Sequence, residues 1–453
     1  MNNLVILMSD EHNPFYSSPY GHEFIHTPNM QKLADIGTLY QNTYCPSPLC
    51  LPSRSAFISG RRVHQIQAYS NCNVNLRKEF PSYGKILKDN GIYSVHIGKT
   101  DAYAPASQLG FSAMINPGER KEPGDTDHCR RPLSIRYGAE KRADGFGYKE
   151  ECSSDVECVD KAVEMLKNGK LCLTSPWVLC VNIVNPHFPH FCPKDLWDRY
   201  SEREDLHKFG TDFESSAHPY AKDLRKHFRT DLFSENQMKG LRRGYYGCVS
   251  FVDRMLGRII TTLEESALLG NTNIVYTSDH GEMLGKFGMW WKCSLYEDSV
   301  RIPMIAAGPD FKRNHIVRTP TELLDLTSFI FASFGIEQPS ECTGIPLNQI
   351  PEYDGERVVF SEYHGHGTRS GAFMVRKGKW KLIFNMEAEN QLFNLAEDPN
   401  ELKNLIYSNP DNAAALEKEL RKICSPEEEN AKAHKFEEEQ FKTINNLKKE
   451  SKK

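Results

Sequence analysis

Four short apolar runs, each ending abruptly in polar residues, constrain the fold of this chain more than any other feature. The runs are rich in β-branched residues and have the length of buried strands. They are Leu4–Met8, Tyr93–Ile97, Trp177–Val184 and Ile274–Tyr276. Helical patterns lie between them, and strands that alternate with helices indicate an α/β fold with a mainly parallel sheet.

The helical segments carry two kinds of signal. Thr27 and Pro28 form a cap followed by a first-turn proline, and Gly37 is expected to end that helix. Asp155–Lys167 and Gly244–Glu265 carry apolar residues at helical spacing. We therefore expect long helices against the sheet.

Acidic residues, histidines and a lysine come directly after the four runs. In order, they are Asp10, Glu11 and His12, then Lys99 and Asp101, then His187, and last Asp279 and His280. Ligands of open α/β sheets bind just outside the carboxyl ends of the strands. These side chains are therefore expected to converge on one site.

The character of the chain changes near Pro351. Short strands of a smaller sheet are expected at Val358–Tyr363, Phe373–Arg376 and Trp380–Phe384, and Ser425-Pro426-Glu427-Glu428 has the form of a capping box. The chain is charged and helical from Asp411 onward. The expected division is a main domain at 1–350, a smaller domain at 351–410 and a helical tail at 411–453.

Composition excludes several classes of protein. The net charge is −4, from 56 basic and 60 acidic residues, so no basic excess indicates nucleic-acid binding. No apolar run approaches the roughly 20 residues of a membrane span, and no export signal is evident. The 13 cysteines are irregularly spaced, so we expect reduced thiols in a cytoplasmic protein.

The segment Cys50-Leu51-Pro52-Ser53-Arg54, followed by Ser59-Gly60-Arg61, is the most specific motif in the chain. It resembles the C-x-P-S-R signature of the type I sulfatases, a family of the alkaline phosphatase superfamily. The resemblance extends to Thr27-Pro28-Asn29, Gly98-Lys99, Pro186-His187-Phe188-Pro189, Ser278-Asp279-His280-Gly281-Glu282 and Gly378-Lys379-Trp380-Lys381-Leu382-Ile383. An ordered set of segments is far more specific than one short motif.

The resemblance implies both fold and reaction. The expected fold is an alkaline phosphatase-like α/β sandwich, with a large, mainly parallel mixed sheet flanked by helices and a smaller C-terminal α+β domain. A formylglycine-generating enzyme would oxidise Cys50 to formylglycine, whose hydrate attacks sulfur to form a covalent sulfo-enzyme intermediate. The reaction is hydrolysis of a sulfate monoester of a small organic molecule or a sugar, and Arg54 would hold the nucleophile and offset charge.

The resemblance also implies one divalent metal ion. Its expected ligands are Asp10, Glu11, Asp279, His280 and the modified Cys50. Hard oxygen ligands favour Ca²⁺, whereas a histidine ligand leaves Mn²⁺ or Zn²⁺ as alternatives.

Lys99, His187 and Lys292 match the sulfate-binding positions of the family. Asp101 stands where many sulfatases have a histidine, and this departure resembles glucuronate 2-sulfatase-like members. The general base is therefore open: Asp101 can serve, and His64 is the other candidate.

Substrate selection is expected to come from loops at the same edge of the sheet. The candidates are His12, Asn13, His64, Tyr103, His190, Trp290, His364, His366 and Arg369. The tail from Cys424 through Lys435 resembles that of choline sulfatases, which implies a homo-oligomer formed through this tail.

Two other functions remain open at this point. Phosphonate monoester or phosphodiester hydrolases share the nucleophile and the metal, so the motif does not separate them from sulfatases. A non-catalytic sulfate-ester binding protein is the second alternative, although every expected catalytic group is present in the sequence.

Overall fold

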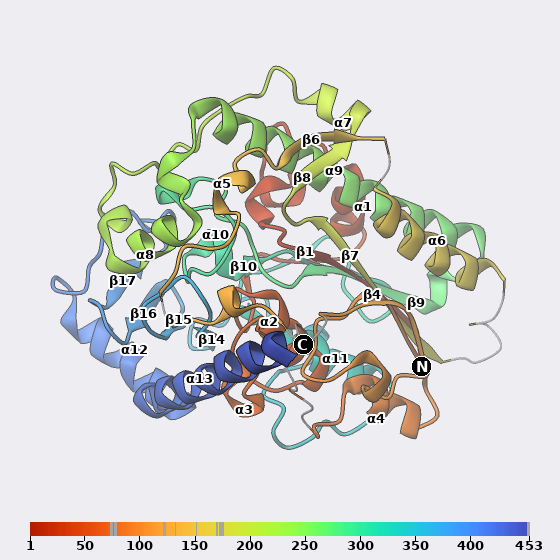
Figure 1. The fold of residues 1–453 in the computed structure, drawn as a ribbon. Helices are drawn as coiled ribbons and strands as arrows, with labels where there is room; N and C mark the ends of the chain where they lie inside the picture. The colour runs from red at the N-terminus through yellow and green to blue at the C-terminus, as the bar shows by residue number, and fades with distance from the viewer. Residues whose placement is uncertain are drawn as a thin grey trace.

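The structure is a computed structural model that describes residues 1–72, 76, 79–120, 124–131, 133–150, 152–168, 171 and 176–450. Its centre is an eight-stranded sheet of order β12-β2-β11-β9-β1-β7-β4-β5. Figure 1 labels β1, β4, β7 and β9 of this sheet. The strands are β1 (Asn3–Asp10), β2 (Thr38–Tyr40), β4 (Tyr93–Lys99), β5 (Ala113–Gly118), β7 (Trp177–Pro186), β9 (Thr272–Ser278), β11 (Met304–Ala307) and β12 (His315–Val317). Helices cover both faces, which confirms the α/β fold class.

The four runs predicted as strands are neighbours in this sheet. β1 lies between β7 and β9 and is parallel to both, with Leu4 opposite Val178 on one side and Asn273 on the other. β4 is parallel to β7, with Tyr93 opposite Trp177. Because parallel strands end at the same edge, the polar residues that follow them are brought together.

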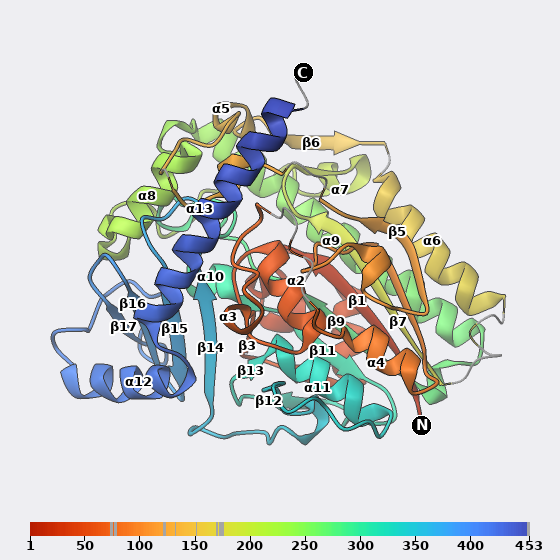
Figure 2. The same cartoon turned by 60° about the horizontal axis from the view of Figure 1, so that its bottom comes forward.

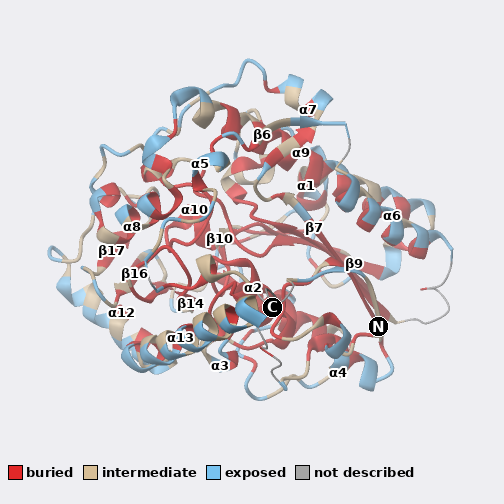
Figure 3. Ribbon diagram, viewed as in Figure 1, coloured by how far each residue is buried: buried red, intermediate tan, exposed pale blue. Residues whose placement is uncertain are grey.

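The alternation of side chains along β1 explains why helices pack on both faces of the central sheet. Val5 and Leu7 pack in the apolar cluster of α1 (Pro28–Asp35), α6 (Ser153–Lys167) and α9 (Glu235–Glu265). Leu4, Ile6 and Met8 share the opposite cluster with residues of α2 (Cys50–Ser59), α4 (Tyr83–Asp89) and α11 (Leu323–Ser333). Period-two alternation therefore places helices on both faces, and Figure 3 shows the buried sheet between them.

The helix α9 begins at Glu235, nine residues before the predicted start at Gly244. Its cap is a box in which Ser234 and Gln237 bond reciprocally. A Cβ at Gly244 would lie 2.3 Å from the carbonyl oxygen of His190, so a glycine is needed for close packing on β8 (His190–Pro193). The interior glycines weakened the helical pattern in the sequence, because glycine has a low helix propensity and is present here to allow close packing.

The C-terminal part forms a separate antiparallel sheet of order β14-β15-β16-β17. Its strands are β14 (Val358–Tyr363), β15 (Ala372–Lys377), β16 (Trp380–Asn385) and β17 (Gln391–Asn394), and the sequence analysis did not predict β17. Leu416 and Leu420 of α12 (Pro410–Ile423) pack on this sheet. The division into domains at 350 and 410 stays a prediction.

The last helix, α13 (Pro426–Glu450), crosses the molecule and packs on its own chain (Figure 2). Glu437 accepts a hydrogen bond from the backbone N–H of Arg130 at 2.9 Å. Ile444 packs in a small apolar cluster with Cys72 and Cys129. The predicted tail thus covers the segment around residue 130, whereas a homo-oligomer stays a prediction. Among the described residues, no helix has an apolar stretch long enough to span a bilayer.

Candidate functional site

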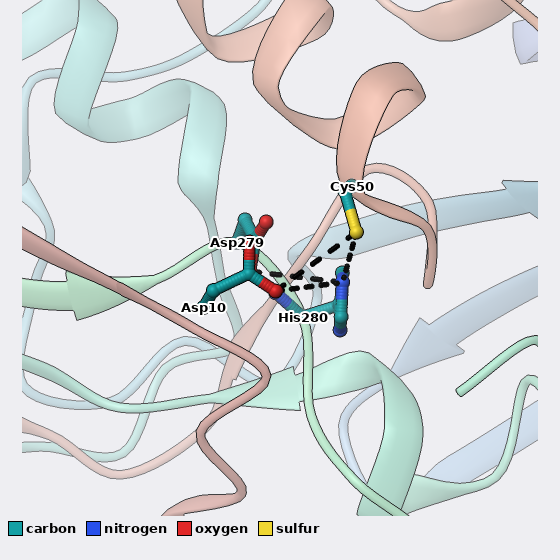
Figure 4. Close-up of side chains that lie close together, drawn as sticks. All are labelled: Asp10, Cys50, Asp279 and His280. Atoms are coloured by element: carbon teal, nitrogen blue, oxygen red, sulfur yellow. Dashed lines mark hydrogen bonds and ion pairs between the residues drawn. The ribbon is translucent and has the colours of Figure 1, made fainter. Parts of the chain in front are cut away.

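Four buried side chains from three separate elements meet at the carboxyl edge of the central sheet. Asp10 ends β1, Asp279 and His280 follow β9, and Cys50 begins α2 (Figure 4). One ligand atom from each lies within 4.8 Å of all the others. The Cys50 Sγ is 3.3 Å from His280 Nε2 and 3.9 Å from Asp10 Oδ1. The convergence predicted from the strand ends is therefore present in the structure.

The first turn of α2 fixes the position of Cys50. Leu49 is extended and precedes the helix, and the N–H of Leu51 donates to Asn71 Oδ1 at 3.0 Å. The Ser53 hydroxyl donates to the Asp279 carbonyl at 2.6 Å and ties this turn to the end of β9. The residue at position 50 thus lies beside the positive end of a helix, which favours a bound anion.

Arg54 holds the two acidic residues together from the second turn of the same helix. Its Nε donates to Asp279 Oδ2 at 2.8 Å and its Nη2 donates to Asp10 Oδ2 at 3.2 Å. Its Nη1 donates to Asn182 Oδ1 at 3.0 Å. The sequence predicted that Arg54 offsets charge, but it did not indicate Asn182, which lies inside β7 and has no motif around it.

The donor set fits a divalent cation. Glu11 Oε1 is buried and has no hydrogen-bond partner among the described residues. This carboxylate oxygen could therefore bind a cation. His280 Nδ1 donates to the Gly281 carbonyl oxygen at 3.1 Å, and its Nε2 faces Cys50. A bond from the other ring nitrogen to a backbone carbonyl is typical of metal-binding histidines.

Opposing electrostatic effects act on the buried groups. Burial opposes ionisation of Asp10, but Lys99, His187 and Arg54 together hold its pKa well below the ordinary value. Burial and the charge of Asp10 oppose ionisation of Cys50, yet Lys292 and Lys99 lower the pKa of its thiol well below the usual range. The surroundings of residue 50 therefore favour negative charge at this position.

Lys99, His187 and Lys292 surround the cluster, as the sequence predicted. Lys99 Nζ forms an ion pair with Asp10. Lys292 Nζ lies 3.2 Å from Glu11 Oε2 and 2.5 Å from His187 Nε2. His187 Nδ1 lies 2.5 Å from the Phe188 carbonyl oxygen and donates to it.

Asp101 lies beside this set and is held by two cations. Its Oδ2 is 3.5 Å from Lys99 Nζ and 3.1 Å from Arg120 Nη2. Its backbone has a φ of 40°, a left-handed conformation that Asp tolerates better than most residues. Arg120 was not singled out in the sequence because it follows a short strand and belongs to no motif.

Several of the proposed substrate-loop residues use their polar atoms inside the protein. His12 Nδ1 lies 2.5 Å from the Tyr276 hydroxyl, and Asn13 Nδ2 donates to the Glu282 carbonyl at 2.9 Å. The Tyr103 hydroxyl donates to the Phe80 carbonyl at 3.0 Å. Side chains with such internal partners are poorly placed to contact a substrate. Their assignment to substrate binding stays a prediction.

The remaining substrate-loop residues fall into three groups. His64 and His364 both bond to Glu362, at 2.8 and 2.9 Å. Arg369 pairs with Asp223 at 2.8 Å. His190, Trp290 and His366 are buried, and His366 Nε2 is 3.8 Å from Cys293 Sγ next to Lys292.

The fold and the site define an α/β protein in which a cysteine at a helix N-terminus adjoins a cluster of side chains that could hold a metal ion. A family model described as Sulfatase matches residues 2–336, and a model described as N-sulphoglucosamine sulphohydrolase, C-terminal, matches residues 285–429. The chain therefore belongs to the sulfatase family and is a sulfuric ester hydrolase.

Individual relatives agree with this assignment. A choline-sulfatase of Rhizobium meliloti (strain 1021) is 30% identical over 426 residues, which cover 89% of this chain and 82% of the relative. An arylsulfatase K of Danio rerio is 26% identical, over 97% of this chain and 87% of the relative. The phosphonate monoester hydrolase of Silicibacter pomeroyi has a similar structure, with a TM-score of 0.74, 20% identity, and coverage of 93% of this chain and 94% of the other. That last likeness is evidence for the fold alone.

Proposed function

We propose that this protein hydrolyses the sulfate monoester of a small organic molecule or a sugar through a formylglycine made from Cys50. The observation that carries the proposal is the position of Cys50 Sγ, which lies 3.3 Å from His280 Nε2 at the start of α2 and is influenced by the charges of Lys99 and Lys292. In the active protein, the oxygens of the hydrated aldehyde would replace this sulfur atom.

Modification of Cys50 explains how one residue serves two chemical steps. One hydroxyl of the hydrated aldehyde forms the bond to sulfur as the ester oxygen leaves, and the other expels sulfate and restores the aldehyde. Arg54 keeps Asp10 and Asp279 oriented through its 3.2 and 2.8 Å contacts. The buried site also limits access of water to the reacting centre.

A divalent ion bound by Asp10, Glu11, Asp279 and His280 would supply positive charge for the nucleophile and for one sulfate oxygen. Ca²⁺ is the expected ion because most of the ligands are carboxylates. Mn²⁺ or Zn²⁺ is the alternative because His280 contributes a nitrogen. Elemental analysis of the purified protein distinguishes these ions.

The surrounding cations bind the sulfate oxygens and the leaving group. Lys99 and Lys292 stabilise negative charge as it develops on these oxygens. The close contact of Lys292 Nζ with His187 Nε2 provides a path for a proton to the departing ester oxygen. Asp101 is the candidate base for sulfate release, while His64 is engaged with Glu362 at 2.8 Å.

Mass spectrometry tests the proposal directly. We expect the peptide that contains Cys50 to carry the aldehyde after co-expression with a formylglycine-generating enzyme, and only this preparation to hydrolyse aryl sulfates. Cys50→Ala should bind metal and fold but release no product. Full activity in a preparation that carries only unmodified Cys50 would refute the mechanism.

Hydrolysis of phosphonate monoesters is the second candidate, because such hydrolases share the nucleophile and the metal with sulfatases and the Cys50 motif does not separate the two. Comparison of kcat/KM on sulfate and phosphonate esters with the same aryl leaving group separates the two. We expect the sulfate ester to be preferred. A reversed preference would assign the protein to the second function.

A further inference from the structure

Three arginines lie beside the sulfate-binding residues, and we call them the arginine rim: Arg120, Arg136 and Arg142. Arg120 follows β5, and Arg142 ends the short helix α5 (Ala139–Arg142), which lies beside α8 (Pro219–Phe228) in Figures 1 and 2. The backbone N–H of Arg136 donates to the His227 carbonyl at 2.9 Å and anchors the segment on α8. None of the three belongs to a motif that the sequence analysis identified.

Arg142 lies against two aromatic residues that flank the catalytic groups. Its guanidinium is 4.9 Å from the ring centre of Phe188, next to His187, and 5.0 Å from that of Trp291, next to Lys292. Among the described residues, no carboxylate lies within ion-pair distance of it. Burial and the nearby charge of Arg136 lower the pKa of Arg142 to about 10, as expected of a crowded cation.

Arg136 also has no carboxylate partner among the residues that the structure describes. Its Nη2 donates to His128 Nε2 at 2.8 Å, and its Nη1 is buried with no partner there. The acidic groups on the same segment are turned to the backbone: Asp125 accepts from the N–H of Asp127, and Asp127 accepts from the N–H of Tyr137.

Three histidines, His128, His227 and His366, also lie beside the segment that carries Arg136. The rings of His128 and His227 are both 5.2 Å from the ring of His366. Burial lowers the pKa of each of these histidines, so they are uncharged near neutral pH. They contribute no negative charge to offset the arginines.

Arg120 connects the rim to the reaction centre. Its Nη2 donates to Asp101 Oδ2 at 3.1 Å, while its Nε is buried without a partner among the described residues. Burial opposes its charge, but Asp101, Cys50 and Asp10 raise its pKa, which places the guanidinium within electrostatic reach of residue 50. Among the residues that the structure describes, the three arginines therefore have one carboxylate ion pair, between Arg120 and Asp101.

The three guanidinium groups are half-buried, and partly desolvated cations with few acidic partners favour the binding of another anion. We propose that the substrate carries a second anionic group besides the sulfate ester, a carboxylate or a second sulfate, and that the arginine rim binds it. Guanidinium groups suit this task because they bind such oxygens in bidentate geometry. A quaternary ammonium group in the same place would be repelled. The inference rests on the proposed function and specifies its substrate class.

The test uses linear sulfate esters of matched length whose far end carries a carboxylate, a second sulfate, a hydroxyl or a trimethylammonium group. With matured, metal-loaded full-length enzyme, we expect kcat/KM for an anionic end to exceed that for the hydroxyl by at least about tenfold at the best chain length. The trimethylammonium ester should be the poorest. The carboxylate and bis-sulfate arms identify which anion is bound.

Variants locate the effect. Arg136→Gln and Arg142→Gln should each lower the ratio of kcat/KM for the anionic ester to that for the hydroxyl ester by about tenfold, and Arg142→Lys should retain part of it. Arg258→Gln is the control, because Arg258 pairs with Asp160 on the far helices α9 and α6. It should keep the wild-type ratio.

The outcomes that overturn the inference differ from those that overturn the function. Equal kcat/KM for anionic and hydroxyl ends at every length, or unchanged ratios in both glutamine variants, would refute binding of a second anion. Failure to hydrolyse any sulfate ester would refute the proposed function instead. In that case, calorimetry can still measure the Kd of the carboxylate ester for unmatured wild-type protein and for Arg142→Gln. If the rim binds the second anion, the variant should bind this ester more weakly.

Discussion

Arg54 Nε donates to Asp279 Oδ2 at 2.8 Å, and both side chains are almost completely buried. The same guanidinium reaches Asp10, so one side chain from the nucleophile helix aligns carboxylates that follow two different strands. The planar fork of arginine can hold two acceptors in fixed directions. This contact couples the position of residue 50 to the geometry of the proposed metal ligands.

Replacement of Arg54 tests this coupling. Arg54→Lys keeps one charge but cannot span both carboxylates, so we expect kcat/KM to fall by at least about 100-fold. Breaking the buried pair should also lower the free energy of unfolding by about 3 kcal/mol, measured by urea denaturation. Arg254→Lys, which alters an exposed pair with Asp195, is the control. Near-normal activity in Arg54→Lys would show that the carboxylates hold their positions without it.

Removal of the metal should lower both activity and stability. An ion at 100 times its Kd stabilises the folded state by about 2.7 kcal/mol, so exhaustive chelation should lower Tm and restored ion should recover it. Asp279→Asn should start with a lower Tm and respond little to the chelator. If chelated wild-type protein retains full rate and Tm, with no metal found by elemental analysis, the metal site is wrong.

Glu437 should make stability depend on pH. Burial raises the pKa of this glutamate to about 7, above its unfolded value of 4.5. A raised carboxyl pKa contributes stability that is complete below the unfolded pKa and is lost as the pH rises through about 7, which amounts to about 3 kcal/mol. Glu437→Gln should remove this loss.

The measurement is the free energy of unfolding at pH 5 and pH 8, by urea denaturation. Wild-type protein should lose more stability over this interval than Glu437→Gln does. Glu439→Gln, at an exposed position of the same helix, should resemble the wild type. Identical pH profiles for all three proteins would mean that Glu437 is ionised throughout, stabilised by Arg130 at 3.7 Å.

The sequence predicted the elements that are encoded locally. Val5 and Leu7 alternate with Leu4 and Ile6 because β1 is covered on both faces. Polar residues that follow the strands meet in the site because parallel strands end at the same edge of the sheet. The helix α9 was predicted too short because Gly244 interrupts its pattern in order to pack closely on His190. Tertiary packing decided that position, and a local pattern does not show it.

The site was predicted where a motif or a strand end marks a residue. Arg136 and Arg142 were missed because they lie on a segment of short turns with no periodicity. Only the folded chain brings Arg142 to Phe188 and Trp291, and Arg136 to His128. Conversely, His12 follows a strand end but bonds inward to Tyr276. Position along the sequence places a residue at the edge of the sheet without fixing the direction of its side chain.

Asp101 provides the sharpest test of the reaction sequence. Its carboxylate lies between Arg120 at 3.1 Å and Lys99 at 3.5 Å, so its two candidate roles are base for sulfate release and positioning of Lys99. Asp101→Asn removes the charge, and Asn also tolerates the left-handed backbone at φ 40°. The variant therefore isolates the charge from the shape.

If Asp101 is the base for sulfate release, Asp101→Asn should give a burst of leaving group followed by slow turnover, with covalent sulfate trapped on residue 50. Rapid-quench kinetics and mass spectrometry measure these two quantities. Equal slowing of both steps would instead identify Asp101 as a positioning residue for Lys99, because Lys99 acts before and after the intermediate. A normal kcat would exclude both roles, and His64→Asn would then be tested despite the bond of His64 to Glu362.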